Sequence, residues 1–316
     1  MGKRGVVIIG SGLIARFHAQ SVKASEKLEL KGFCDTFSVE SAKKAAAEFG
    51  GEAWGDLDAA LSAPGVGMAT VATASGGHDE AVFAAARHKV PILVEKPLSI
   101  TVARIDAMIA ACRESGTPLG CIFQSRWSED YENARAKIAS GELGKLTYAG
   151  IRIPWGREDD YYVKSSWHGT WKIDGGGALM NQSIHMVDWL VSLMPDVEDV
   201  KAFAATLAHP METEDTVSAA IRFKGGALGG VYAATSSFPG RGKTMEITGT
   251  KGTLEIRDDA HGTSRPDQLE YAGHLKCFEA FADSLEPGGA PYPIPGEEAR
   301  KSVDLIERIY KAAGIR

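Results

Sequence analysis

The sequence predicts an α/β fold with two domains, in which a doubly wound parallel sheet comes first and a second, open sheet follows. Short apolar runs alternate with helical patterns through residues 1–123, as in parallel strands joined by helices. Longer segments within residues 124–316 alternate apolar and polar residues, as in strands with one exposed face. The length of 316 residues also exceeds the usual size of one hydrophobic core. We therefore predict two domains, 1–123 and 124–316.

The first domain begins with a strand and a helix. Gly5 to Ile9 is a β-branched apolar run, a helical pattern continues through Val22, and Leu28 to Cys34 is predicted as the second strand. Further helical patterns at residues 38–49, 56–61, 78–88 and 101–114 alternate with apolar runs at 68–72, 91–94 and 119–123. In such a sheet, ligands bind at the carboxyl ends of the strands.

A glycine turn joins the first strand to the first helix. The sequence G-S-G-L-I-A at residues 10–15 fits the dinucleotide fingerprint: Gly10 permits the tight turn and Gly12 lets a pyrophosphate approach, with Leu13 and Ile14 completing the loop. Asp35 ends the second strand, where a carboxylate can accept hydrogen bonds from the adenosine ribose. It would repel a 2′-phosphate, so we expect NAD rather than NADP. The alternative is a surface acid that caps the helix near Ser38.

Other residues are expected at the same edge of the sheet because they follow the fourth, fifth and sixth strands. These are Thr73, Ala74, His78, Glu95, Lys96 and Gln124, which we predict to contact the cofactor. Lys96 can also hold a substrate oxygen or exchange a proton if partial burial lowers its pKa. A solvated surface charge is the alternative for this lysine.

The stretch from Asp174 to Asp188 contains three consecutive glycines followed by an apolar segment. Asn181 and His185 are four residues apart, so a helix places both on one face. Glycines are costly at the start of a helix, which suggests that something approaches this backbone closely. The alternative is a flexible loop before an ordinary core helix.

Aromatic and polar residues are concentrated between residues 155 and 172. Aromatic faces can pack on sugar C–H groups while polar side chains bind hydroxyls, although aromatic residues also fill cores. As candidate substrate-binding residues we name Arg157, Tyr162, Trp167, His168 and Trp171, together with Arg126, Trp127, Asn181 and His185.

The second domain is predicted to start with a helix at 128–143 and a strand at 146–155. Alternating segments at 200–208, 216–223, 227–236, 244–248 and 253–256, with glycine turns between them, predict a meander-like open sheet. Helices at 273–285 and 297–313 close the chain. Helix 297–313 is assigned to the second domain, and packing of this helix back on the first domain is the alternative.

Composition argues against several classes of partner. Apolar residues make up 44% and charged residues 24%, as in ordinary globular proteins. The formal net charge is −6 and lysine and arginine form no run, so no concentrated basic face is expected. We predict a small-molecule substrate, no nucleic-acid partner and no membrane partner.

The cysteines and the N-terminus predict a cytoplasmic protein. Cys34, Cys112, Cys121 and Cys277 form no C-x-x-C pair, so we interpret them as reduced core residues. The first apolar run breaks at Gly10 and no long apolar segment follows, so neither a signal peptide nor a membrane span is expected.

Histidine and acidic residues show no metal-binding pattern, and we predict no metal. No partner can be assigned from the sequence to His18, His88, His209, His261 and His274. Asp188 lies one helical turn after His185. It is interpreted either as a group that orients the imidazole or as a structural acid facing solvent or a helix end.

Four motifs together resemble the glucose-fructose oxidoreductase / inositol dehydrogenase / rhizopine-catabolism (Gfo/Idh/MocA) family. They are the glycine fingerprint, E-K-P-L at 95–98, F-Q-S-R-W at 123–127, and the glycines followed by N-x-x-x-H-x-x-D. The resemblance implies an N-terminal Rossmann domain and a C-terminal α/β domain with a large, open, mostly antiparallel sheet. It also implies a homodimer or homotetramer formed through the exposed face of that sheet.

The resemblance implies a catalytic set as well. Lys96 and His185 match the family's lysine and histidine, but Asn181 stands where the family more often has an acid, and an amide cannot exchange protons. We therefore expect Asn181 to orient the substrate, with His185 as general base or acid. The implied activity is NAD(P)-dependent oxidation of a secondary hydroxyl of a sugar, sugar derivative or cyclitol. An enzyme that recycles NAD within each turnover and a non-catalytic NAD-binding regulator are the alternatives.

Overall fold

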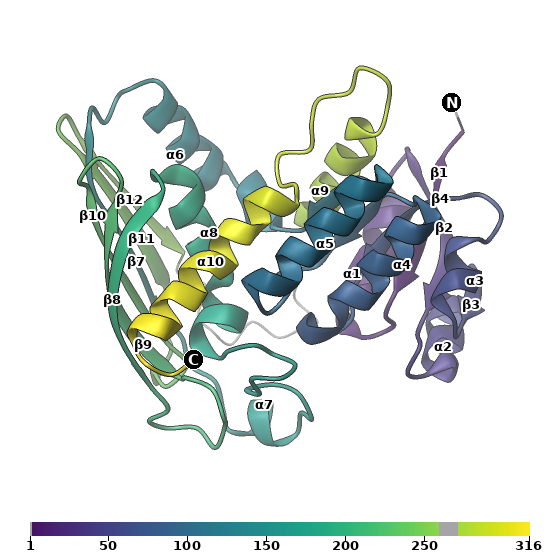
Figure 1. The fold of residues 1–316 in the computed structure, drawn as a ribbon, viewed down its shortest axis with the longest axis horizontal. Coiled ribbons are helices and arrows are strands. Elements are labelled where there is room, and N and C mark those ends of the chain that lie inside the picture. The colour runs from purple at the N-terminus through teal and green to yellow at the C-terminus, as the bar shows by residue number, and fades with distance from the viewer. Residues whose placement is uncertain (1, 259–270) are drawn as a thin grey trace. The chain divides into compact units, whose positions relative to one another are not determined.

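The structure is a computed structural model that describes residues 2–258 and 271–316 (Figure 1). The described residues form two compact units. Of the described residues, the first unit contains 2–99, 103–124 and 271–300, and the second contains 100–102, 125–258 and 301–316. The chain thus passes between units after Gln124, next to the predicted boundary. In addition, residues 271–300 belong to the first unit although the sequence placed them in the second domain.

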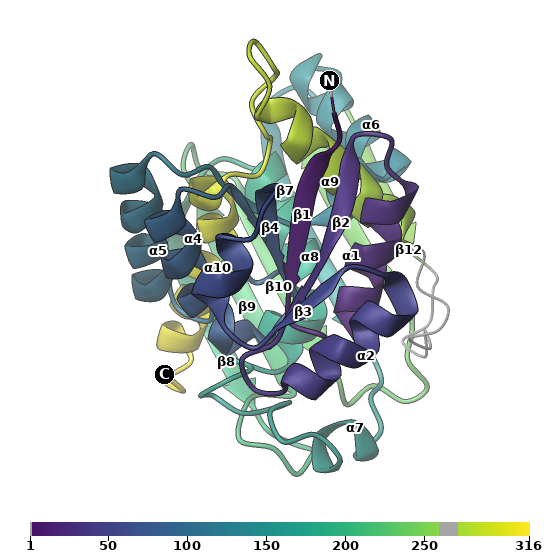
Figure 2. The same cartoon turned by 90° about the vertical axis from the view of Figure 1, so that its right-hand side faces the viewer.

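The first unit contains a parallel sheet with the order β3-β2-β1-β4-β5-β6, and Figure 2 shows β1 between β2 and β4. Its strands are β1 (Arg4–Ile9), β2 (Leu28–Cys34), β3 (Glu52–Trp54), β4 (Val66–Val71), β5 (Ile92–Val94) and β6 (Leu119–Cys121). This sheet confirms the predicted doubly wound class. The strand order reverses at β1, so the carboxyl ends of β1 and β4 form the switch point at which such sheets bind ligands.

Helices of the first unit begin and end close to the predicted residues. They are α1 (Leu13–Ala24), α2 (Val39–Phe49), α3 (Leu57–Leu61), α4 (His78–His88) after the short η1 (Ser75–Gly77), α5 (Val102–Ser115) and α9 (Ala272–Ser284). Side-chain caps explain two of the starts: Ser38 accepts from the Ser41 N–H, and Asp56 accepts from the Ala59 N–H. Helix α9 lies against α1, where Ser25 Oγ donates to Glu279 at 2.9 Å.

A second sheet, with the order β12-β11-β7-β10-β9-β8, forms the second unit (Figure 1). Its strands are β7 (Leu146–Pro154), β8 (Val197–Ala205), β9 (Thr216–Phe223), β10 (Leu228–Ala234), β11 (Lys243–Gly249) and β12 (Thr253–Asp258). Among the described strand pairs, β7 and β10 are parallel and the others antiparallel. The predicted meander is therefore wrong at one point: β7 separates β10 from β11, because the chain crosses over β7 after β10.

Helices cover one face of this second sheet. Residues in β9 alternate between buried and exposed, and α8 (Ile184–Leu193) packs on the buried face against β7. The other helical segments are η2 (Gln124–Trp127), α6 (Glu129–Ala139), α7 (Asp160–Val163), the π-helix η3 (Ala178–Ser183) and α10 (Gly296–Ala312). No helix in residues 2–258 and 271–316 is long and apolar enough to cross a membrane. The four cysteines are free and buried, as predicted.

Three glycines before η3 allow close packing within the second unit. A Cβ on Gly175 would lie 2.4 Å from Ile100 Cβ, one on Gly176 would lie 2.1 Å from the Tyr310 hydroxyl, and one on Gly177 would lie 2.1 Å from the Glu214 carbonyl oxygen. The expectation of a close approach to this backbone is thus explained by the protein's own atoms.

Replacing Gly177 with alanine should destabilise the fold, because the new methyl group overlaps backbone that cannot move as a flexible side chain can. We expect the free energy of unfolding to fall by about 1–3 kcal/mol or more in urea titrations. Gly252→Ala is the matched control: its Cβ would make only an ordinary 3.5 Å contact with Leu143. Equal losses in both variants would contradict this account.

Candidate functional site

The glycine loop after β1 has the geometry of an anion-binding turn. Gly10 has φ +97°, and a Cβ there would lie 2.8 to 2.9 Å from the backbone of Ala72 and Thr73. Gly12 is the N-cap of α1; among the described residues no side chain caps this helix, and nothing lies within 4 Å of a Gly12 Cβ. The first N–H groups of α1 therefore face an open approach, which fits the pyrophosphate of a dinucleotide. Leu13 is exposed beside it, and Ile14 packs on the core.

Asp35 lies next to this loop. Its Oδ1 accepts from the N–H groups of Phe37 and Ser38 at 3.1 and 3.0 Å, and its Oδ2 accepts from Ser11 Oγ. Helix α2 is capped by Ser38, so the alternative of Asp35 as the N-cap is wrong. The half-buried carboxylate instead links the end of β2 to the glycine loop, where a ribose hydroxyl is expected.

At the ends of β4, β5 and β6 the predicted residues differ in exposure. Thr73, Ala74, Lys96 and Gln124 are partly exposed, whereas His78 and Glu95 are buried. The His78 ring contacts the Thr73 carbonyl through Nε2 at 3.1 Å and the Pro97 carbonyl through Nδ1 at 3.0 Å, and burial lowers the pKa of His78. The side chains of His78 and Glu95 are thus buried and form hydrogen bonds within the protein, whereas we predicted that they contact the cofactor.

His185 is a half-buried residue of α8. Its Nδ1 lies 3.3 Å from Ser125 Oγ, and this hydroxyl oxygen accepts from Trp189 Nε1 at 3.0 Å. With one lone pair used by Trp189, Ser125 can either donate to Nδ1 or accept from it. Both neutral tautomers of His185, and the imidazolium, are therefore compatible with this contact.

Asn181 belongs to the π-helical turn η3, so it does not continue the regular α-helical spacing that the sequence predicted. Its Nδ2 donates to Asp174 Oδ1 at 2.7 Å, and its Oδ1 accepts from Gln182 Nε2 at 3.1 Å. Asp174 is buried, and its Oδ2 accepts from the Gly169 N–H at 2.8 Å. A carboxylate thus lies directly behind the amide and determines its orientation.

Arg157 continues this network. Its Nε and Nη2 donate to Gln182 Oε1 at 3.1 and 2.7 Å, and Gln182 Nε2 donates to the Tyr161 hydroxyl at 3.1 Å. The guanidinium carbon lies 5.4 Å from the centre of the Trp155 ring and 4.8 Å from that of Tyr161. Burial lowers the pKa of Arg157 and raises the pKa of Tyr161.

The predicted aromatic residues fall into two groups. His168 stacks on Tyr161 with ring centres 4.1 Å apart and contacts Trp167, and burial lowers the pKa of His168 to about 4. This group is partly exposed and can face a ligand. In contrast, Tyr162 is buried beside His209, and Trp171 packs on Tyr310 of α10.

Arg126 forms a buried ion pair. Its Nε and Nη2 donate to Asp188 at 2.6 and 2.7 Å, and Ser302 Oγ donates to the same carboxylate at 3.2 Å. Both partners are buried, so the interpretation of Asp188 as an acid facing solvent is wrong. The predicted substrate role of Arg126 competes with this structural use, while Trp127 remains partly exposed.

The structure shows contacts for most of the histidines to which the sequence assigned no partner. His18 and His274 contact Glu95, His88 contacts Asp58, His209 contacts Asp159, and His261 lies outside the described residues. Sequence reasoning also missed Ser125, Gln182 and Glu214. No spacing in the sequence identifies them, because each meets its partners through the tertiary fold.

Glu214 caps the glycine segment. Its Oε2 accepts from the Gly177 N–H at 3.0 Å, and its Oε1 accepts from the Leu179 N–H and the Tyr310 hydroxyl, each at 2.9 Å. Gly177 has no side chain with which to cap η3, so Glu214 provides acceptors for the first N–H groups. Burial raises the pKa of Glu214 to about 7 despite these donors.

Comparisons with known proteins agree on one family. The model of the oxidoreductase family with an NAD-binding Rossmann fold (GFO_IDH_MocA) matches residues 4–123, and that of the GFO/IDH/MocA C-terminal domain matches residues 131–255. Myo-inositol 2-dehydrogenase of Thermotoga maritima is 27% identical over 94% of this chain and 92% of that protein. The NAD⁺-dependent scyllo-inositol 2-dehydrogenase of Bacillus subtilis is 29% identical over 79% of this chain and 72% of that protein.

A solved structure extends this similarity. The WlbA dehydrogenase from Bordetella pertussis, in complex with NADH and UDP-GlcNAcA, superposes with a TM-score of 0.91. It is 29% identical to this chain, and the match covers 99% of this chain and 97% of that one.

The raised pKa of Glu214 predicts a pH-dependent stability. The folded state holds this proton up to about pH 7, whereas the unfolded chain releases it near 4.5, the ordinary pKa of a glutamate side chain. The contribution is therefore complete below the unfolded pKa and is lost as pH rises through the folded pKa. We expect the free energy of unfolding of wild type, relative to Glu214→Gln, to decrease by roughly 2–4 kcal/mol from pH 4.5 to 7.5. A difference that is flat across this range would contradict the assignment.

The contact between Asn181 and Asp174 predicts that the amide and the carboxylate can trade positions, whereas two carboxylates at these positions destabilise the fold. Asn181→Asp places two carboxylates in contact, and we expect it to lower the free energy of unfolding by on the order of 2–3 kcal/mol at neutral pH. The double variant Asp174→Asn with Asn181→Asp restores one amide and one carboxylate and should recover most of that loss. Asn133→Asp on the exposed side of α6 is the control. Failure of the exchange to recover stability would refute the pairing.

Proposed function

The chain belongs to the GFO/IDH/MocA oxidoreductase family, and we propose from this premise which substrate it uses and which residues carry the reaction. Its activity is NAD-dependent hydride transfer at a hydroxyl group of a sugar or cyclitol, the class of reaction named for its relatives. The observation that carries the proposal is the combination of an NAD-compatible glycine loop with a half-buried His185 whose Nδ1 contacts an adaptable hydroxyl.

NAD is the cofactor. Gly10, Gly12, Leu13 and Ile14 are proposed to hold the pyrophosphate, and Asp35 the adenosine ribose. Thr73, Ala74, Lys96 and Gln124 are proposed to line the nicotinamide half, and His78 and Glu95 to support them from inside the protein. The cofactor, when bound, accepts the hydride.

Proton transfer is assigned to His185. Its neutral imidazole takes the proton of the reacting hydroxyl and becomes an imidazolium, whose Nδ1–H donates to Ser125 Oγ. Asn181 holds the substrate oxygen through the hydrogen-bonding capacity of its amide that Asp174, Gln182 and Tyr161 leave available, since each amide atom can make two hydrogen bonds. Lys96 polarises the same oxygen. Because Asn181 stands where the family more often has an acid, proton transfer depends on His185, assisted by Lys96.

The substrate is proposed to be a nucleotide-linked sugar acid, with free sugars and cyclitols as the alternatives. The WlbA dehydrogenase holds UDP-GlcNAcA and matches this chain over almost its entire length. In the second unit, Arg157 provides a cation among Trp155, Tyr161 and His168, which suits an anionic sugar. Trp127 and Trp167 are proposed to pack on the sugar ring. Arg126, Tyr162 and Trp171 are proposed to support this wall through their packing.

Assembly and location are proposals as well. On the exposed face of the second sheet, Phe203 and Leu228 are 86% and 55% exposed and Tyr148 lies nearby in β7. Such apolar exposure supports a homodimer or homotetramer formed through this sheet. Four buried free cysteines agree with a reducing, cytoplasmic compartment.

The test of the chemistry is His185→Ala. We expect kcat to fall by about 10²–10⁴-fold, because the group that moves the proton is lost, while the NAD dissociation constant changes less than about threefold. Turnover is measured by NADH absorbance with UDP-GlcNAcA, sugar acids and inositols as candidates. His88→Ala, on the opposite end of α4 from the ligand edge, is the matched control. Unchanged kcat in His185→Ala would refute the role.

The same assay separates the remaining functions. Stoichiometric NADH release argues against internal recycling of NAD, and any turnover argues against a non-catalytic regulator. Neither alternative is favoured by the relatives, which are named as dehydrogenases.

A further inference from the structure

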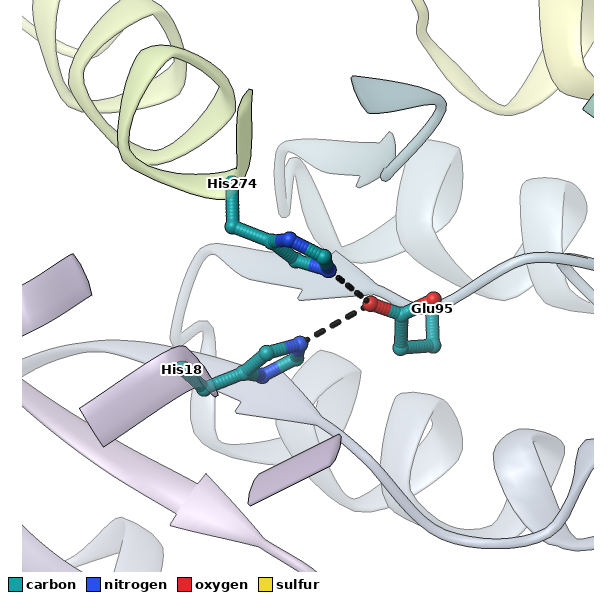
Figure 3. A group of neighbouring side chains, drawn as sticks. All are labelled: His18, Glu95 and His274. Carbon is teal, nitrogen blue, oxygen red and sulfur yellow. Dashed lines mark hydrogen bonds and ion pairs between the residues drawn. The ribbon is translucent and has the colours of Figure 1, made fainter. Parts of the chain in front are cut away.

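A buried cluster lies at the end of β5 and joins three segments that are far apart in the sequence (Figure 3). Glu95 Oε1 lies 3.0 Å from Nε2 of His18 and 3.0 Å from Nε2 of His274. His18 comes from α1 and His274 from α9, and all three side chains are buried in the first unit. A carboxylate in such surroundings remains ionised only when donors stabilise its charge.

The contacts assign the protons of the cluster. His18 Nδ1 lies 3.1 Å from Thr70 Oγ1, so a neutral imidazole can accept from that hydroxyl while its Nε2–H donates to Glu95. Burial lowers the pKa of His18, which keeps it neutral. Burial by itself raises the pKa of Glu95, but the hydrogen bonds from His18 and His274 outweigh it and hold this pKa well below its usual range. Glu95 is therefore ionised.

The second carboxylate oxygen of Glu95 contacts the main chain of Lys96. Glu95 Oε2 accepts from the backbone N–H of Lys96 at 3.0 Å, and the Glu95 N–H donates to the Val71 carbonyl at 3.0 Å. On the other side of Lys96, the His78 ring contacts the Pro97 carbonyl. Buried histidines thus hold the main chain on both flanks of this lysine.

We propose that His18 and His274 are positioning residues for Lys96. By donating to Oε1 they keep Glu95 ionised and oriented, so that its Oε2 fixes the Lys96 amide and with it the origin of the lysine side chain. Residues 271–300 join the first unit and thereby bring His274 to this cluster. The predicted effect on activity rests on the proposed function, whereas the predicted effect on the Lys96 amide does not.

The same donor set could accommodate a divalent cation, since the three ligand atoms lie within 4.8 Å of one another. Hydrogen bonding is favoured because both ring nitrogens of His18 and both oxygens of Glu95 have polar partners within the first unit. A metal would displace the two N–H donors that stabilise the carboxylate. Metal binding is therefore an outcome that would overturn the proposal.

Selective labelling can observe the Lys96 amide directly. The sequence contains two Glu-Lys pairs, Glu26–Lys27 and Glu95–Lys96, so the full chain labelled with ¹³C-carbonyl glutamate and ¹⁵N-lysine gives two filtered amide signals. Lys27 is the internal reference. The variants are His274→Gln, whose side-chain amide can still donate to Glu95, and His274→Leu, which cannot.

We expect the Lys96 signal to shift and its hydrogen exchange to accelerate by about tenfold or more in His274→Leu, with a near wild-type signal in His274→Gln and no change at Lys27. In the NADH assay, kcat should fall at least about tenfold in His274→Leu and recover in His274→Gln, with the NAD dissociation constant within about threefold of wild type. An unmoved Lys96 amide, or equal changes in both variants, overturns the proposal. If the Lys96 amide changes as expected in the His274 variants but the wild-type protein turns over no sugar, the positioning role is supported and the proposed function is refuted.

Two measurements on wild type keep the proposal testable if His274→Leu does not fold. Imidazole ¹⁵N spectra should show His18 and His274 with the proton on Nε2, and the other tautomer at either residue contradicts the donor assignment. After incubation with zinc and dialysis, elemental analysis should find less than about 0.1 equivalent. One tightly bound equivalent that is lost in His274→Gln would establish a metal site instead.

Discussion

Hydrogen bonds to the buried carboxyl group of Glu214 are the interaction on which the second unit depends. This carboxyl group accepts from the first N–H groups of η3 and the Tyr310 hydroxyl, and thereby joins the segment before β9, the start of the helix that carries Asn181 and His185, and α10. Such proximity is possible because Gly176 and Gly177 have no side chains where Tyr310 and Glu214 approach. The positions of Asn181 and His185 therefore depend on close packing among Gly176, Gly177, Glu214 and Tyr310.

Buried acids are used in the same way elsewhere in the chain. Glu95 joins α1, β5 and α9 in the first unit, and Asp188 joins Arg126 and Ser302 in the second. In each case one carboxylate receives hydrogen bonds from segments separated by tens of residues or more. Such groups are costly to bury and become favourable only when every partner is present, so they favour one arrangement of these segments over its competitors.

The amide at position 181 is oriented by a buried carboxylate of the same unit. Asp174 provides a carboxylate 2.7 Å from Asn181 Nδ2, so the negative charge lies seven residues earlier in the chain, behind the amide and buried. A second acid at 181 would meet this charge directly. The proposed role of Asn181, which is to orient an oxygen rather than to carry a charge, agrees with this arrangement.

The sequence by itself determined the parallel sheet and the glycine turn with Gly10 and Gly12, and it proposed Lys96 and His185 as the reacting residues. These follow from local signals: apolar period, turn residues and short motifs each depend on neighbours a few positions away. Tertiary structure alone decided the place of β7 between β10 and β11, the membership of α9 in the first unit, and the partners of His18, Arg126 and Asn181. Hydrogen bonds between residues distant in the chain leave no periodic trace in the sequence, because either partner is compatible with many local structures and only the fold brings the two together.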